Sequence, residues 1–204
     1  LGEDSRIGRK YLSGGLGYGG PCFPRDNVAL SYFAREIGAS TPLGEATDAF
    51  NRDIPQRSAE KIMGMLKPKA RVAVLGLSYK PFSPVVEESQ GLALALALAN
   101  KGATVIGYDP LAMDSAKQVA HGKIIMMSSI QECLSGVDAI VITTPDPMFA
   151  NLELVDFEMC NPNAIIYDYW RILAGKFTGS SFRYTAAGIP VESNKNSELL
   201  KKMW

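Results

Sequence analysis

The sequence is poor in residues that cross-link small proteins or hold metal ions. It has three widely spaced cysteines, Cys22, Cys133 and Cys160, and a single histidine, His121. An odd number of distant cysteines argues against a disulfide framework, and one imidazole does not make a structural zinc site. We therefore expect no metal, and the unpaired thiols favour a reducing, cytoplasmic location.

Charge of one sign and long apolar runs are also missing. The 21 basic residues balance the 21 acidic ones, so no overall positive field attracts nucleic acid or anionic lipid. The longest aliphatic run, residues 92–99, is far shorter than the roughly 18 apolar residues of a membrane helix. We expect neither nucleic acid nor a membrane as partner. The chain begins with Leu1 and carries no secretory signal, which indicates a fragment of a longer protein.

The apolar pattern divides the chain into two parts. Helical spacing extends over about 26–66, and a helix starting at Thr41-Pro42 should run long, with Pro55 kinking or dividing it. After residues 67–69 the pattern alternates between strands and helices. We predict strands at 71–77, 103–110, 123–127, 138–144 and 164–170, and helices at 88–101, 115–121, 129–134 and 194–203.

This alternation predicts an α/β fold. Parallel βαβ units of these lengths form a doubly wound, Rossmann-like sheet of about 130 residues. We therefore expect two domains, a helical one at 1–66 and a sheet domain at 70–204.

The segment 13–26 carries the strongest functional signal. Five glycines fall within residues 14–20, and because such density costs backbone entropy, it predicts a turn that closely approaches a ligand. Cys22 follows, and Asp26 lies one helical turn further on. A thiolate is a strong nucleophile, and a nearby carboxylate can activate the water that hydrolyses a thioester. The alternative is a buried thiol, with Asp26 as the N-cap of a helix beginning near Asn27.

The turn after the first predicted strand lacks the glycine fingerprint of a dinucleotide site. It reads GLSYKP, so this sheet is not expected to be the main NAD pyrophosphate site. Lys80 follows the carboxyl end of the strand, with Tyr79 as a stacking face, and this pair suits a nucleotide. The alternative is a solvated lysine beside a half-buried tyrosine. Asp109, after the second strand, either binds a ribose or caps a turn.

Three stretches of this sequence together resemble one family. DSRIG at 4–8, YLSGGLGYGGPCFPRD at 11–26 and GLSYKP at 76–81, followed by EES at 87–89, are similar to the UDP-glucose/GDP-mannose dehydrogenases. The resemblance covers the whole chain and implies oxidation of a UDP-sugar C6 hydroxyl to a carboxylate, with two successive NAD molecules as cofactor. It also implies that the NAD-binding domain lies outside this sequence, and that a homodimer forms through the long helix near 42–66.

The resemblance also implies roles for individual residues. Cys22 matches the nucleophile that forms the thioester, and Asp26 matches the aspartate that helps to activate water. Arg6 matches an arginine that reaches the substrate across a dimer, and Arg25 stands near the nicotinamide of the cofactor. Three residues match the loop that holds the sugar and diphosphate: Tyr11, Gly15 and Gly19. Lys80 matches a lysine that contacts the substrate, and Arg171 matches an arginine that approaches the nucleotide.

Several positions depart from the family pattern. Glu87 replaces an arginine that contacts NAD in the family, and a carboxylate there would repel a pyrophosphate by about 1 kcal/mol at a solvated site. The family's Thr-Glu-Trp is here Thr144-Pro145-Asp146, and Trp170 replaces one of two adjacent arginines. These changes motivate a second hypothesis, a nucleotide-binding dimer module that does not catalyse. The sequence leaves open which nucleotide sugar is bound.

Overall fold

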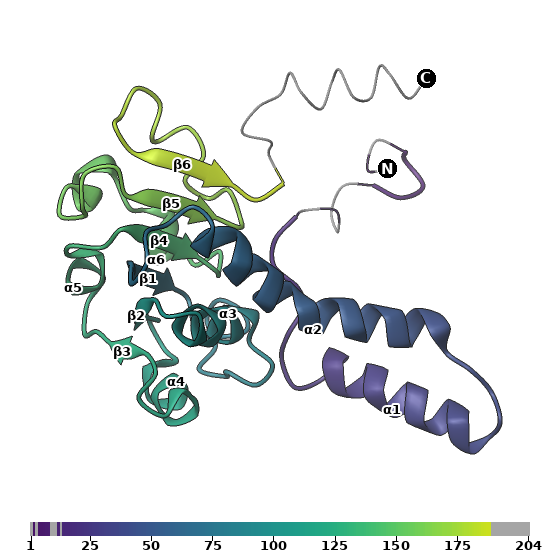
Figure 1. The fold of residues 1–204 in the computed structure, drawn as a ribbon. Helices are drawn as coiled ribbons and strands as arrows, with labels where there is room; N and C mark the ends of the chain where they lie inside the picture. Colours follow the sequence, from purple (N-terminus) through teal and green to yellow (C-terminus); the bar gives the residue numbers. More distant parts are fainter. Residues whose placement is uncertain (1, 3, 9–11, 13, 189–204) are drawn as a thin grey trace.

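The computed structural model describes residues 2, 4–8, 12 and 14–188. Within these ranges six strands form one parallel sheet in the order β3-β2-β1-β4-β5-β6 (Figure 1). The strands are β1 Arg71–Leu75, β2 Thr104–Tyr108, β3 Ile125–Met126, β4 Ala139–Ile142, β5 Ile165–Asp168 and β6 Arg183–Ala186. This is the order of a doubly wound sheet whose topological switch point lies between β1 and β4. The predicted α/β class is therefore confirmed.

The first five strands lie where the sequence predicts them, and β6 was missed. No helix leads into β6; turns and bends connect it to β5, so the helical pattern that marks the other crossovers is missing there. The predicted helix at 194–203 lies outside the described residues. The helices after β1 are α3 Gln90–Asn100, α4 Met113–Ala120, α5 Ile130–Leu134, the short α6 Pro147–Ala150 and the 3₁₀ turn η1 Leu154–Phe157.

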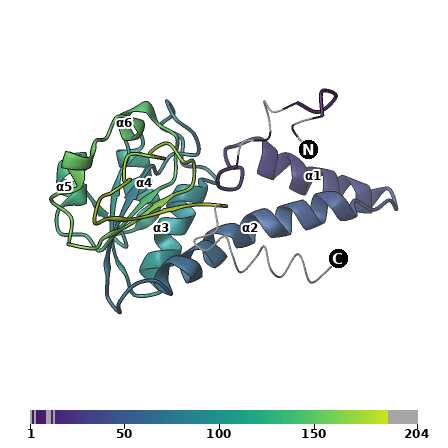
Figure 2. The same ribbon diagram turned by 90° about the horizontal axis from the view of Figure 1, so that it is seen from above.

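Helices cover both faces of the sheet (Figure 2). On one face α3 and α4 pack against Val72, Val74 and Val141, together with the end of the long helix α2 Pro42–Met63. On the other face α5, α6 and η1 enclose a second cluster, in which Phe149 and Phe157 are fully buried. Strand residues are buried on alternating sides into both clusters, as expected for a parallel sheet covered on both faces.

Two long helices, α1 Phe23–Glu36 and α2 Pro42–Met63, form a hairpin that projects from the sheet (Figure 1). As predicted, Pro42 starts α2, where a missing N–H costs nothing. Pro55 does not divide α2, which continues to Met63 with Ala59 and Ile62 buried in the core. Packing of this last part against α3 offsets the hydrogen bond that proline removes.

Two buried aspartates hold the loops at the carboxyl edge of the sheet. Asp109 accepts hydrogen bonds from the backbone N–H groups of Leu77, Ser78, Leu111 and Ala112 and from the Ser78 hydroxyl. Of the two roles open for Asp109, the structure shows the loop-capping one. Asp168, at the end of β5, accepts bonds from the N–H groups of Trp170, Arg171 and Leu173 and from the Tyr184 hydroxyl.

We predict that Asp168→Asn lowers the free energy of unfolding by about 3 kcal/mol, because an amide group would face donors that now bond a fully buried carboxylate. Urea denaturation followed by circular dichroism measures this change. Tyr184→Phe, which removes one of the four bonds, should cost about 1 kcal/mol. Equal midpoints for wild type and Asp168→Asn would contradict the assignment.

Candidate active site

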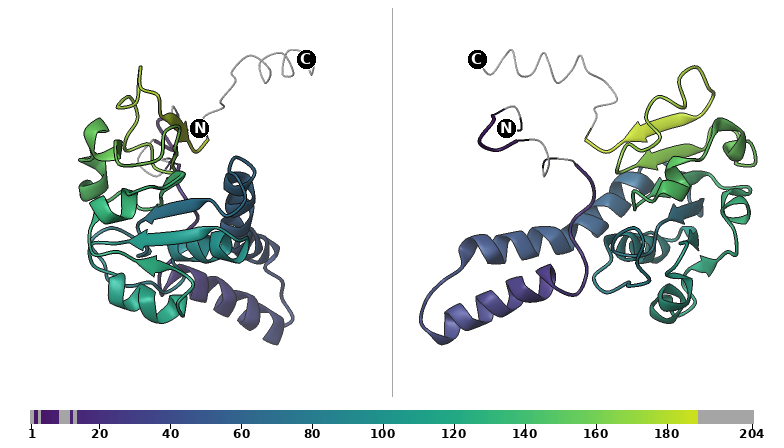
Figure 3. Two further views of the ribbon diagram at one scale, coloured as in Figure 1. Left: turned by 60° about the vertical axis from the view of Figure 1, so that its left-hand side comes forward. Right: turned by 180° about the vertical axis from the view of Figure 1, so that it is seen from behind.

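The glycine-rich segment 14–20, called the strap from here on, crosses the carboxyl edge of the sheet before entering α1 (Figure 3). Its Gly20 N–H donates to the Glu87 carbonyl over 3.0 Å. The backbone N–H and C=O of Tyr18 both bond the Asn51 side-chain amide of α2, over 3.0 and 2.9 Å. The strap is thus tied both to the helical hairpin and to the loop after β1.

The glycines allow the strap to lie directly on aromatic rings of the sheet domain. A Cβ on Gly15 would come within 2.6 Å of the Trp170 ring, and one on Gly20 within 2.6 Å of the Tyr79 ring. Gly20 also has a φ of +87°, a backbone conformation that residues other than glycine rarely adopt. The close approach that the glycine density predicted is therefore made, in this structure, to the chain's own side chains.

Cys22 lies at the N-cap of α1, immediately after the strap, and its side chain is exposed. The helix starts at Phe23, so Asp26 stands in its first turn, and the alternatives of a buried thiol and of a helix beginning near Asn27 are wrong. The Asp26 N–H donates to the Cys22 carbonyl over 2.8 Å. The i, i+4 spacing puts the thiol and the carboxylate on neighbouring turns of one helix face.

The other two cysteines are in a different environment. Cys133 and Cys160 belong to the buried cluster under α5 and η1. Burial raises the pKa of the Cys133 thiol to about 12 and that of the Cys160 thiol to about 11, because a thiolate is poorly solvated there. Among the three cysteines, Cys22 is therefore the one whose thiol is exposed.

The predicted substrate residues of the sheet domain lie along the strap. The half-buried ring of Tyr79 packs beneath Gly20, and the Lys80 ammonium is 5.3 Å from the centre of that ring. At the other end of the strap, the Arg171 guanidinium donates to the carbonyls of Ala187 and Gly14, over 3.1 and 3.4 Å. The structure thus brings Tyr79, Lys80 and Arg171 to one edge, with the predicted Gly15 and Gly19 between them.

The remaining predicted residues are more scattered. Arg6 is exposed and forms an ion pair of 2.6 Å with Asp4. Arg25 is exposed on the first turn of α1, three residues after Cys22. Tyr11 lies outside the described residues. Glu87 and Glu88 are exposed before the N-cap of α3, with Glu87 joined to the strap through its carbonyl.

Three residues that hold the strap were not predicted: Asn51, Gln90 and Trp170. Asn51 is 4% exposed and stands on the face of α2 that buries Pro55, Ala59 and Ile62. A polar side chain on an otherwise apolar helix face was the signal available in the sequence, since such a group needs a buried partner. Trp170 covers Gly15 and donates from its indole nitrogen to the Thr143 carbonyl over 2.8 Å.

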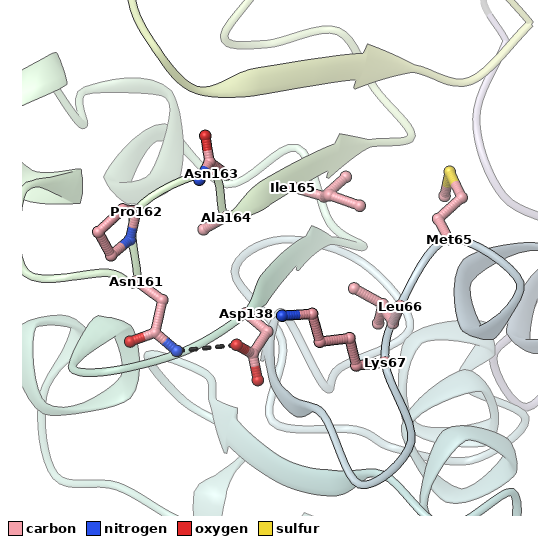
Figure 4. A pocket seen from close by; sticks show the side chains of 9 residues that line it. All are labelled: Met65, Leu66, Lys67, Asp138, Asn161, Pro162, Asn163, Ala164 and Ile165. Atoms are coloured by element: carbon pink, nitrogen blue, oxygen red, sulfur yellow. Dashed lines mark hydrogen bonds between the residues drawn. The ribbon is translucent and has the colours of Figure 1, made fainter.

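One cavity lies between the strap and the helical hairpin, and another lies at the amino edge of the sheet. The first, of about 310 Å³, is lined by Tyr18, Phe23, Asn27 and Thr47, between the strap and the hairpin. The second, of about 270 Å³, lies before β4 and β5 near the end of α2, where Asn161 donates to Asp138 over 2.8 Å (Figure 4). Open α/β sheets bind ligands at the carboxyl ends of their strands. We therefore assign the candidate site to the carboxyl edge.

Within the described part of the chain, no group of three or more His, Cys, Asp or Glu side chains is arranged to hold a metal ion. In the same part, no helix has both the length and the apolar character needed to cross a membrane.

We predict that iodoacetamide modifies Cys22 alone in the folded protein near pH 8, because the other two thiols are buried and have raised pKa values. Mass spectrometry should find one modified site before unfolding and three after it. Modification of Cys133 or Cys160 at a rate comparable to that of Cys22 would refute this difference.

Gly15→Ala should destabilise the protein by about 1–3 kcal/mol, because its methyl group collides with Trp170. Trp170→Leu should remove most of that penalty, so thermal unfolding of the single and double variants should show strong coupling. Gly64→Ala is the matched control, since Gly64 has a helical φ of −63° and a Cβ there makes ordinary contacts. Additive effects at positions 15 and 170 would contradict the packing of the strap on this ring.

Known proteins match both the helical part of the chain and its sheet domain. The UDP-glucose 6-dehydrogenase of Rhizobium meliloti (strain 1021) is 32% identical over 194 residues, which cover 93% of this chain and 44% of that enzyme. The UDP-glucose 6-dehydrogenase AglM of Haloferax volcanii is 36% identical over 154 residues, covering 75% of this chain and 36% of the enzyme. A solved UDP-glucose dehydrogenase from the hyperthermophilic archaeon Pyrobaculum islandicum has a TM-score of 0.74 at 30% identity, covering 90% of this chain and 41% of that one.

The chain therefore spans less than half the length of these relatives. Residues 1–53 match the central domain of one family, and residues 73–175 match the UDP binding domain of the same family. These matches confirm the resemblance expected from the motifs, and the chain belongs to the UDP-glucose/GDP-mannose dehydrogenase family.

Proposed function

We propose that this chain supplies the thiol and the nucleotide site of an NAD-dependent nucleotide-sugar 6-dehydrogenase that oxidises the C6 hydroxyl of a UDP-sugar to a carboxylate. The observation that carries the proposal is the exposed Cys22 at the N-cap of α1, one turn from Asp26 and beside a strap tied to the sheet edge. The proposed division of labour gives residues 1–66 the thiol and the dimer contact, and residues 70–204 the nucleotide.

In the proposed reaction Cys22 acts on the aldehyde formed by the first oxidation. Its thiolate adds to C6 and forms a thiohemiacetal, and the second oxidation removes the C6 hydrogen and leaves a thioester. Asp26 orients and deprotonates water, which attacks the thioester carbonyl, so that the C–S bond breaks and the thiol is regenerated with the carboxylate. NAD supplies the acceptor for the two hydrides when it is bound.

The sheet of this chain is a poor site for the NAD pyrophosphate. The N–H groups of Leu77 and Ser78, in the turn after β1, both donate to the Asp109 carboxylate, so neither is available to an anion. We propose that NAD binds to a domain beyond this sequence, with Arg25 on the side that faces the nicotinamide. The relatives are more than twice as long as the matched region, which leaves room for such a domain.

The substrate diphosphate has several cationic partners at the carboxyl edge. Lys80 and Arg171 lie at opposite ends of the strap, and guanidinium groups form strong bonds with phosphate oxygens. Tyr79 offers a ring for stacking. Arg6 would reach the substrate of a partner copy, and the glycines at 15 and 19 would let the sugar approach the backbone.

A homodimer is part of the proposal because the hairpin exposes large apolar side chains. On α1 the residues Phe23, Leu30 and Phe33 are 51–72% exposed, and the C-cap residue Ile37 is 63% exposed. On α2 Leu43 and Phe50 are 83% and 60% exposed. Contiguous apolar surface of this kind marks an interaction site. The free cysteines fit a cytoplasmic enzyme.

The proposal is tested by NADH formation with UDP-glucose, UDP-N-acetyl sugars and GDP-mannose, in a polypeptide of the relatives' length. Cys22→Ala should lower carboxylate formation by at least about a thousandfold, because the thioester cannot form. Cys160→Ala, the same change at a buried site, is the control and should retain most activity. Carboxylate formation that survives Cys22→Ala would refute the covalent route.

The second candidate function, a nucleotide-binding dimer module without catalysis, is favoured by Glu87. Its carboxylate is exposed beside the strap, where a negative charge opposes a dinucleotide. A polypeptide of the relatives' length that is stabilised by UDP in thermal unfolding, yet forms no NADH, would favour this module. The chain of 204 residues by itself should bind UDP without reducing NAD.

A further inference from the structure

The backbone of the strap does not belong to the sheet, so its N–H and C=O groups need hydrogen-bond partners elsewhere. Tyr18 is not in a strand, yet its N–H donates to the side-chain amide of Asn51 and its C=O accepts a hydrogen bond from the same amide. Asn51 thereby acts as a neighbouring strand residue would, with one donor and one acceptor. Since Asn51 is 4% exposed, water cannot easily replace it.

The bonded Tyr18 also holds the first turn of α1. Its hydroxyl accepts a hydrogen bond from the Asn27 amide over 2.9 Å, and its ring meets the edge of Phe23 with centroids 6.3 Å apart. Phe23 and Asn27 flank the turn whose N-cap is Cys22. The amide of Asn51 on α2 is therefore connected through a single tyrosine to the turn that presents the thiol.

A second connection fixes the strap between Tyr18 and the thiol. The N–H of Gly20 donates to the Glu87 carbonyl, and the Tyr79 ring fills the space beside Gly20. Cys22 itself is exposed, so its position is set by the backbone on either side rather than by packing of its own side chain.

We propose that Asn51 is a positioning residue for Cys22, acting through Tyr18, and this inference rests on the proposed function. Gln90 reaches the same Tyr18 carbonyl over a longer 3.3 Å, and its buried Oε1 has no partner among the described residues. Asn51 therefore provides the better bonds of the two amides. Its loss should misplace the thiol without altering Lys80, Tyr79 or Arg171, which hold the nucleotide in the proposed function.

Asn51→Asp tests this directly, because the acceptor for the Tyr18 N–H remains while the donor to the Tyr18 carbonyl becomes a repelling oxygen. In a polypeptide of the relatives' length, kcat should fall about tenfold or more, while KM for the UDP-sugar changes less than about twofold. Hydrogen exchange at the Tyr18 amide should become faster. Asn100→Asp, the same change at the exposed last residue of α3, should leave kcat, KM and the exchange at Tyr18 unaltered.

Gly17→Ala is a second variant that leaves α2 intact. Its Cβ would collide with the Asn51 Oδ1 and displace the amide, so it should reproduce the loss of kcat if Asn51→Asp fails to fold. Unchanged kcat in the folded variants overturns the inference, as does a loss of kcat without faster exchange at Tyr18. A wild-type protein that oxidises none of the sugars refutes the proposed function instead. In that case the rate at which iodoacetamide alkylates Cys22 is measured in place of kcat. Equal alkylation rates in the wild type and the variants overturn the positioning role.

Discussion

The arrangement of the candidate site depends on one contact, the packing of a nearly bare backbone against aromatic rings. Between residues 14 and 20 the strap has almost no side chains of its own, and it lies against Trp170 at one end and Tyr79 at the other. A side chain at position 15 or 20 would collide with the Trp170 or the Tyr79 ring. The entropy that these glycines lose on folding is offset by contacts that join two parts of the chain distant in sequence.

The same edge is stiffened from within the sheet. Asp109 holds the turn after β1, which carries Tyr79, and Asp168 holds the loop after β5, which carries Trp170. Each buried carboxylate accepts several N–H bonds, and a group with so many partners allows its loop little freedom. The rings under the strap therefore stand on fixed loops, and the thiol after the strap inherits a defined position from them.

The turn after β1 differs from the corresponding turn of a dinucleotide-binding sheet in what its N–H groups bind. In a dinucleotide-binding sheet, the N–H groups of this turn face a pyrophosphate. Here Leu77 and Ser78 give those groups to Asp109, and Gly76 faces Thr144. In the proposed function, this sheet therefore receives the nucleotide from the strap side. The departures at Glu87 and Trp170 lie on that side as well.

Some features could be read from residues close together in the chain. The change from helical to strand periodicity near residue 68 predicted the α/β class and five strands, since burial on two faces leaves apolar runs in the sequence. The spacing of Cys22 and Asp26 predicted neighbours on a helix. The strand β6 could not be predicted because no helix precedes it, and the start of α1 at Phe23 was missed because Pro24 and Asp26 suit more than one capping arrangement.

By itself the sequence determined the fold class, the glycine-rich segment and the neighbouring positions of Cys22 and Asp26, because each of these depends on local backbone preference or on apolar period. Only the tertiary structure decided what the glycines touch, that Asn51 bonds the backbone of Tyr18, and that Asp109 closes the turn after β1. Those contacts join residues 31 to 157 positions apart. Their partners are set by the packing of the hairpin and the sheet, which no local sequence pattern records.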